Sequence, residues 1–268
     1  MGTLILAVTT LFLYSIGTAL QALGFRGRIS VNKNILTVIG ALGLVAHGLL
    51  VWRTLFQDGA LNLGFFQSSL LISWLMVALL LIMNLRKPLD GLFLGVYPLA
   101  CITVVFALLT HAPPRFIQRD DWGILSHIAL SVTAYSLFAL AAGQALLLYF
   151  QNRQLKQNYN SPLVRNLPPL QTMESLLFEL VWAGVILLVL AIVTGAIFVS
   201  DLFAQDLAHK TVFSLISLAV FAALLIGRQT QGWRGITASR WTLAGCALLA
   251  LAYYGSKFVL ELVFHRAG

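Results

Sequence analysis

Eight stretches of mostly apolar residues, each near the length that a bilayer requires, run along this 268-residue chain. A helix needs about 20 such residues to cross the ~30 Å hydrocarbon core of a membrane. There is no alternation with a period of two residues, which would be typical of a transmembrane β-barrel. The pattern therefore predicts an all-α, polytopic membrane protein with helices at about 3–23, 35–52, 66–85, 91–111, 122–150, 174–199, 211–227 and 240–264, the second and seventh being short.

The composition agrees with this class of protein. Charged residues make up only 10% of the chain, hydrophobic residues 59%, and the mean hydropathy is +0.90. A soluble domain carries about 25% charged residues. Nearly all of the chain lies in the predicted helices or in short connections, so we expect a single membrane domain over residues 1–268.

The net charge of +8 first suggests a nucleic-acid-binding protein, but the distribution of the basic residues indicates membrane orientation instead. By the positive-inside rule, loops rich in Lys and Arg face the cytoplasm. We therefore expect both termini outside and no nucleic-acid partner. Eleven of the seventeen Lys and Arg residues lie in four alternate connections, at 24–34, 86–90, 151–173 and 228–240.

Several catalytic and redox motifs are missing from the sequence. Cys101 and Cys246 both lie inside predicted helices, and neither belongs to a C-x-x-C pair or to a C-x-x-C-H haem attachment motif. We also find no Walker A motif, no H-E-x-x-H zinc pair and no G-x-S-x-G elbow. The sequence therefore argues against dithiol chemistry and against a c-type cytochrome. We expect no enzyme activity.

Small and aromatic residues fit a bundle of membrane helices. Glycines at 184, 195 and 245 lie inside predicted spans, where they permit close approach of helices. Tryptophans flank the predicted boundaries, as an aromatic belt does: Trp52 and Trp122 on the outer side, Trp233 and Trp241 on the inner side.

All the histidines fall on the predicted outer half of the protein. His47 and His127 lie within spans, where ionisable groups are costly and usually face the bundle interior or a cavity. Neutral imidazole is also an axial ligand of haem iron. Interfacial histidines are equally tolerated as simple polar caps, so the residues alone leave both interpretations open. The five are His47, His111, His127, His209 and His265.

Two stretches resemble the cytochrome c assembly proteins, a family of haem-handling membrane proteins. In this family a Trp shortly precedes a His, and a Tyr follows eight residues later; here these are Trp122, His127 and Tyr135, in "HIALSVTAYSLFALAAGQALLLYF" and just before it. The family's Gly-Trp-Arg-Gly follows the next-to-last predicted helix as "GWRG". An aromatic–Gly pair comes next, with His265 about ten residues beyond it. The resemblance covers about 40–265.

The chain departs from the family just before the next-to-last predicted helix. The family's tryptophan-rich outer segment is replaced by "VSDLFAQDLAHKTVFS", in which Lys210 matches by its spacing to "GWRG". A family His late in the next-to-last helix is replaced by Ile226. The chain thus resembles the smaller, HemX-like or YpjD-like branch.

The resemblance implies a multi-pass protein of the cell inner (cytoplasmic) membrane that holds or passes non-covalent b-type haem near the outer face. We expect His127 and His265 as axial ligands of the iron and His47 as a second or transit site. Trp122, Tyr135 and Lys210 complete the candidate haem-binding set. The expected partners are the lipid bilayer and cytochrome assembly or other inner-membrane proteins.

Two alternatives remain. A regulatory membrane protein of the same fold could act on a partner complex without haem. A small-solute or ion transporter could use His47 and Glu179 in its pathway, although inverted repeats and broken helices, the usual signs of that class, are not evident.

Overall fold

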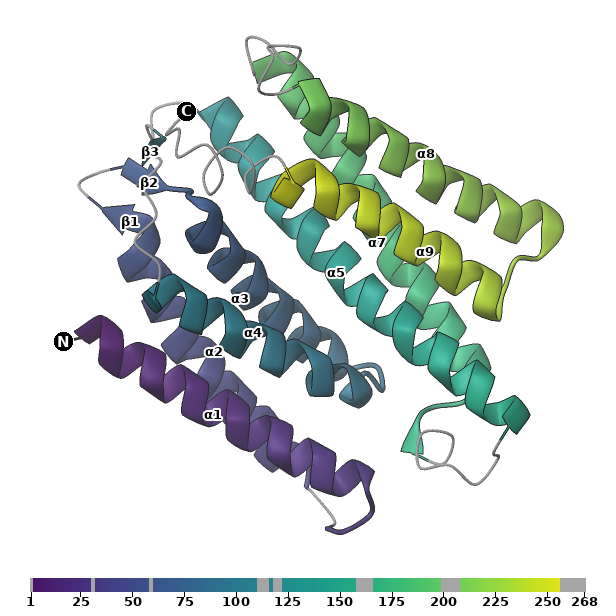
Figure 1. Cartoon of the computed structure of the whole chain (residues 1–268), viewed down its shortest axis with the longest axis horizontal. Coiled ribbons are helices and arrows are strands. Elements are labelled where there is room, and N and C mark those ends of the chain that lie inside the picture. Colours follow the sequence, from purple (N-terminus) through teal and green to yellow (C-terminus); the bar gives the residue numbers. More distant parts are fainter. Residues whose placement is uncertain are drawn as a thin grey trace. The chain divides into compact units, whose positions relative to one another are not determined.

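The computed structural model describes residues 2–29, 32–57, 60–109, 116–117, 122–157, 166–198 and 208–255. Within these ranges eight helices are long and apolar enough to cross a membrane, which confirms the predicted all-α, polytopic fold. On which side of the membrane the termini lie stays a prediction. The helices, in chain order (Figure 1), are α1 (Gly2–Phe25), α2 (Lys33–Leu55), α3 (Phe65–Asn84), α4 (Phe93–Leu109, preceded by the 3-10 turn η1, Asp90–Leu92), α5 (Trp122–Gln157), α7 (Leu170–Phe198), α8 (Ala208–Gln231) and α9 (Gly235–Ala250, continued by the π-helical turn η2, Leu251–Gly255).

The helices predicted as short are longer in the structure. Helix α2 extends past both predicted ends, because Asn32 caps its first turn by accepting a hydrogen bond from the Asn34 N–H (2.9 Å) and Arg53 lies in its last turn. Helix α8 likewise continues to Gln231. Polar residues at helix ends lower the apolar score of a window without ending the helix.

The described chain forms two compact units, and we treat each by itself. Unit 1 contains α1 to α4, the small sheet and the last turn of α5 from Gln154; unit 2 contains the rest of α5 with α7, α8 and α9. The prediction of one membrane domain is not tested by this division.

Unit 1 is a four-helix bundle in which α1 and α3 each pack against α2 and α4. Glycines make room for aromatic rings at these contacts. A Cβ atom on Gly17 would lie 2.8 Å from the ring of Tyr97, and one on Gly43 would lie 2.6 Å from the ring of Tyr14. Both tyrosine rings are buried and stack on each other with their centroids 4.9 Å apart.

A small antiparallel sheet at one end of unit 1 was not predicted. Its strands follow one another in the order β1 (Phe56–Gln57), β2 (Ala60–Asn62) and β3 (Phe116–Ile117). Phe56 pairs with Leu61, which in turn pairs with Ile117. Strands of two or three residues are too short to produce a recognisable sequence pattern.

In unit 2, α8 packs against α9 and α7, and α7 also contacts α9 and α5; glycines and aromatic rings form several contacts in the unit. Phe138 of α5 and Phe221 of α8 stack with their centroids 4.2 Å apart. The Phe138 ring lies on Gly184 and the Phe221 ring on Gly245, at 2.9 and 2.7 Å from where a Cβ atom would be. These contacts confirm that the two glycines allow close helix packing. Cys101 and Cys246 are free thiols inside helices, as predicted.

Candidate functional site

The imidazole of His127 is fixed to the backbone of the neighbouring helix in unit 2. Nδ1 lies 2.7 Å from the carbonyl oxygen of Ala191 on α7. Gly195 makes this approach possible, because a Cβ atom there would lie only 2.9 Å from Cε1 of the imidazole. Gly123, one turn before His127, is likewise in close contact with the Phe198 ring of α7. Two glycines therefore bring α5 and α7 close enough for the ring to reach a backbone carbonyl.

This contact decides which ring nitrogen carries the proton. A carbonyl oxygen can only accept, so Nδ1 must be the donor, and neutral His127 keeps its lone pair on Nε2. Ala191 is the only hydrogen-bond partner of the ring among the described residues. Histidines that bind metals commonly donate their other ring N–H to a carbonyl or carboxylate in this way, which fixes the ring and raises its basicity. The ring is half-buried.

Tyr135 lies two turns deeper on α5, about 12 Å from His127 along the helix axis. Its ring contacts that of Tyr253 with the centroids 5.3 Å apart, and the Ser214 side chain of α8 lies within hydrogen-bonding reach. Tyr253 belongs to η2, where the helix widens to a π-helical turn, and its ring meets Tyr254 edge-on. Such turns are frequent at functional sites.

The remaining predicted residues of unit 2 are placed differently from one another. Lys210 is half-buried in the first turn of α8. This turn lies at the same end of unit 2 as the start of α5. Trp122 is the first residue of α5 and 83% exposed, so its indole does not cover the imidazole. His265, the predicted second axial ligand, lies outside the described residues, as do His111 and Asp206.

His47 belongs to unit 1 and is fully enclosed there. Its exposed fraction is 0%, and its Nδ1 lies 3.3 Å from the hydroxyl of Tyr14 on α1. The backbone of Leu70 on α3 lies near the ring. Nε2 nevertheless has no hydrogen-bond partner among the described residues. A buried polar atom in this state costs about 1–3 kcal/mol.

The surroundings of His47 are tightly packed. Trp74 of α3 donates its Nε1–H to the Leu44 carbonyl (3.1 Å) and rests on Gly48, so its ring spans the turns on either side of His47. Because the His47 ring is fully buried, a flat macrocycle could reach Nε2 only by displacing packed side chains. Haem binding at His47 stays a prediction.

The described residues contain no group of three or more His, Cys, Asp or Glu side chains placed to hold a metal ion. Two partners of His127 were not predicted. The Ala191 carbonyl has no sequence signal, because any residue supplies one. The sequence indicates that Gly195 permits close helix packing. The structure shows that the group packed against it is the His127 imidazole.

Comparison with known proteins extends over nearly the whole chain. Residues 35–264 match the cytochrome C assembly protein family. The inner membrane protein YpjD of Escherichia coli (strain K12) is 30% identical over 263 residues, covering 97% of this chain and 99% of that protein. The protein HemX of Brevibacillus brevis is 24% identical over 92% of this chain and 93% of its own length.

A cytochrome c biogenesis protein, CcsA of Prochlorococcus marinus (strain MIT 9515), is 25% identical over 73% of this chain and 78% of its own length. These relatives agree with the predicted HemX-like or YpjD-like branch and with a multi-pass protein of the inner membrane. The chain belongs to the cytochrome C assembly protein family.

Proposed function

We propose that this protein binds b-type haem non-covalently at the end of unit 2 that contains His127, and holds or passes it without chemical change. The observation that carries the proposal is the 2.7 Å contact between Nδ1 of His127 and the Ala191 carbonyl. It prepares Nε2 as an oriented, unprotonated nitrogen, which is the form that ligates haem iron.

The other residues proposed for this site fit such a ligand in their chemistry. Haem supplies an iron that accepts imidazole nitrogen, and two propionates that require cationic or hydrogen-bonding partners. Lys210, in the first turn of α8, is our candidate for a propionate. Tyr135, Tyr253 and Tyr254 form a cluster of aromatic rings farther along unit 2. His265 remains the candidate for the second axial position.

The relatives support this class of function. One of them is named as a cytochrome c biogenesis protein. In this proposal the chain is an assembly factor rather than an enzyme, and its partners are cytochrome assembly or other inner-membrane proteins. His47 is the candidate for a second or transit site.

The test is the absorption spectrum of the full-length protein, purified in detergent after haem supplementation. We expect a Soret band in the wild type, its loss in His127→Ala, and its return when imidazole is added to that variant. His209→Ala is the matched control, because His209 is a half-buried histidine in the first turn of α8. We expect this variant to keep its haem.

Three outcomes would contradict the proposal. A colourless wild type would favour a regulatory protein of the same fold that works without haem. Full haem content in His127→Ala would make His127 an ordinary polar residue. Equal losses in His127→Ala and His209→Ala would indicate a general disturbance of unit 2.

A further inference from the structure

The turn between α8 and α9 carries a rigid pair of stacked indoles. The Trp233 ring lies directly against Gly227, and its Nε1–H donates to the Gln231 side chain (2.8 Å). Trp241 stacks on it with the ring centroids 5.0 Å apart and the planes inclined by 27°. Gly232 and Gly235 adopt positive φ angles of 68° and 52°, which bring the chain back over so short a distance. Both indoles are thereby fixed at the end of unit 2.

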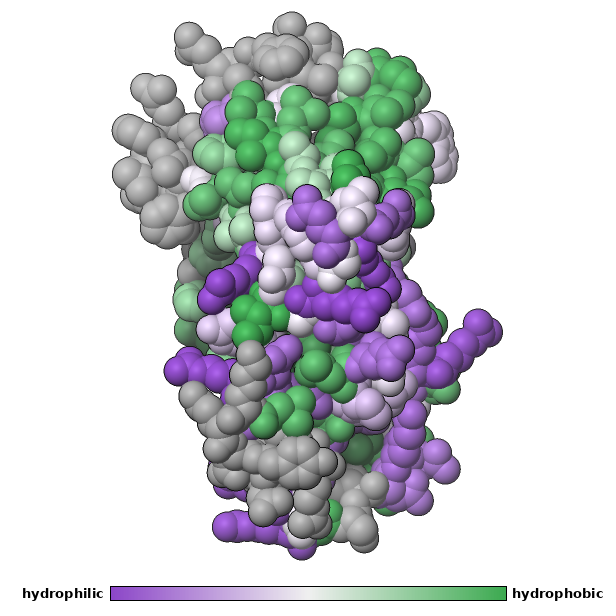
Figure 2. All heavy atoms as spheres, turned by 90° about the vertical axis from the view of Figure 1, so that its right-hand side faces the viewer, coloured by the Kyte–Doolittle hydropathy of each residue, from purple (hydrophilic) through white to green (hydrophobic). Residues whose placement is uncertain are grey.

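Three arginines are sequence neighbours of the two stacked indoles or of Gly227, on which Trp233 rests. Arg228 follows Gly227, Arg234 follows Trp233, and Arg240 precedes Trp241. Hydrophilic side chains gather on the face that carries the α8–α9 turn (Figure 2). Arg234 and Arg240 are exposed. We call the set formed by Arg228, Arg234, Arg240, Trp233 and Trp241 the arginine–indole surface.

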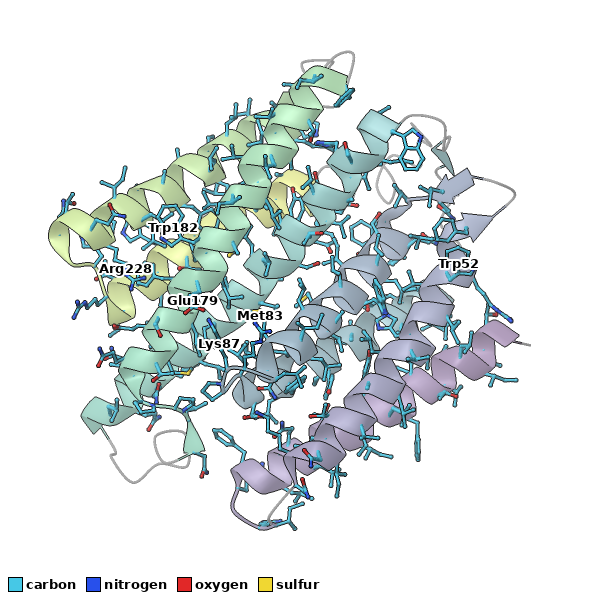
Figure 3. The ribbon with its side chains drawn as sticks, turned by 180° about the vertical axis from the view of Figure 1, so that it is seen from behind. Trp52, Met83, Lys87, Glu179, Trp182 and Arg228 are labelled. Atoms are coloured by element: carbon cyan, nitrogen blue, oxygen red, sulfur yellow. The ribbon has the colours of Figure 1, made fainter. Side chains whose placement is uncertain are left out.

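None of these three positive charges is neutralised within the described part of the chain. The Arg228 guanidinium lies 3.7 Å from the centre of the Phe178 ring of α7. Figure 3 labels Arg228 and Glu179, the residue that follows Phe178 in the sequence. No described carboxylate forms an ion pair with any of the three arginines. Glu174 is nearby, but its Oε1 accepts a hydrogen bond from the Gly235 N–H (2.7 Å) at the start of α9.

Two of the arginines lie inside the ends of apolar helices, where a phosphate could serve as their anionic partner. Arg240 lies five residues into α9 and Arg228 three residues before the end of α8, which places their backbones about 7.5 Å and 4.5 Å inside the helix ends. We expect these ends of the two spans to lie near the lipid headgroups, where a cation requires an anionic partner or extension toward water.

We propose that the arginine–indole surface binds the headgroup of an anionic phospholipid. The guanidinium fork matches a phosphate bidentately, and the segment from 228 to 255 has no lysine, although lysine would serve equally well as an orientation signal. Stacked indoles supply the amphipathic surface that suits the glycerol level of a lipid. The charge favours an anionic over a zwitterionic lipid.

The test is native mass spectrometry of the full-length protein in detergent, titrated with phosphatidylglycerol or phosphatidylcholine. We expect the wild type to retain phosphatidylglycerol preferentially. The triple variant Arg228→Gln, Arg234→Gln, Arg240→Gln should bind it about 100-fold more weakly. The matched control carries Arg26→Gln, Arg28→Gln and Arg86→Gln, three exposed arginines of unit 1 that remove the same charge. It should bind nearly as the wild type.

Replacing Arg228, Arg234 and Arg240 by Lys controls for misfolding of the Gln variant. This triple variant keeps the positive charge and loses only the planar guanidinium. We expect it to bind phosphatidylglycerol several-fold more weakly than the wild type. Equal losses in the two Gln variants would reduce the effect to net charge and overturn the proposal. So would the absence of a preference over phosphatidylcholine. Displacement of the lipid by millimolar inorganic phosphate would show a free-phosphate site instead.

Discussion

The two intramembrane histidines show opposite ways of placing an imidazole in a helical bundle. His47 in unit 1 is fully enclosed, shares a hydrogen bond with a tyrosine hydroxyl, and leaves Nε2 without a partner among the described residues. His127 in unit 2 is half-buried and bound to a backbone carbonyl. A hydroxyl can donate or accept, so it leaves the tautomer of His47 open. A carbonyl fixes the tautomer of His127. The second arrangement leaves an oriented, unprotonated Nε2 when the imidazole is neutral, whereas the first leaves a buried nitrogen without a hydrogen-bond partner among the described residues.

The largest expected effect separates these two roles directly. His127→Ala should remove the haem and lower the free energy of unfolding by only about 1 kcal/mol, since one hydrogen bond is lost from a half-buried site. His47→Ala should keep the haem of unit 2 and lower the free energy of unfolding by about 1–3 kcal/mol, because a cavity opens while an orphaned nitrogen is removed.

Haem content and denaturant unfolding, measured on the same preparations, check this difference. His47→Phe preserves the ring volume and isolates the cavity contribution. A fall in haem stoichiometry in both His47 variants would instead identify His47 as the second haem site.

A comparable effect on stability and a smaller one on haem binding are expected when a glycine beside Tyr14 or beside His127 receives a methyl group. Gly43→Ala drives a Cβ atom to 2.6 Å from Tyr14, which is fully buried and cannot move away, so we expect a loss of about 1–3 kcal/mol in unfolding free energy. Gly195→Ala pushes the half-buried His127 ring off the Ala191 carbonyl. We expect haem affinity about tenfold weaker with little change in stability.

The control for both is Gly95→Ala on α4, where nothing lies within 4 Å of the added Cβ atom. Unfolding curves and haem titrations of the three variants provide the measurement. Unchanged haem affinity in Gly195→Ala would show that the Ala191 contact does not prepare the ligand.

The smallest effect concerns the hydroxyl of Tyr14. Tyr14→Phe removes the 3.3 Å contact with His47 and leaves both ring nitrogens of His47 without a side-chain hydrogen-bond partner among the described residues. Side-chain hydrogen bonds between membrane helices average about 0.6 kcal/mol, so we expect a loss of that size. A double-mutant cycle with His47→Phe measures the coupling. Zero coupling would mean that the pair is only a packing contact.

The sequence predicted the helices well because the bilayer makes length and apolarity decisive. It predicted the ends less well, since Arg53 and Arg228 lower the apolar score of positions that remain helical. It also indicated His127 as a ligand candidate, through its position in a span and through the resemblance. The residues could not reveal that Ala191, 64 positions away, completes the arrangement, because that contact depends on how α5 and α7 are aligned.

His47 illustrates the opposite limit. The residues alone make His47 and His127 equal candidates, because both are single histidines in apolar spans, and only the family resemblance gives them different roles. The enclosure of His47 depends on Tyr14, 33 positions earlier, and on Trp74 of a third helix. Burial in a bundle is a property of several helices at once, so no local pattern distinguishes an enclosed histidine from an accessible one.

The short turn after α8 constrains how this part of the chain enters the membrane. Only residues 232–234 separate Gln231 from Gly235, and the two flanking glycines have the positive φ angles that the reversal requires. A connection of three residues is too short to let one helix span the membrane while the other stays in water far from it. We therefore expect helices α8 and α9 to enter the membrane together, as one helical hairpin.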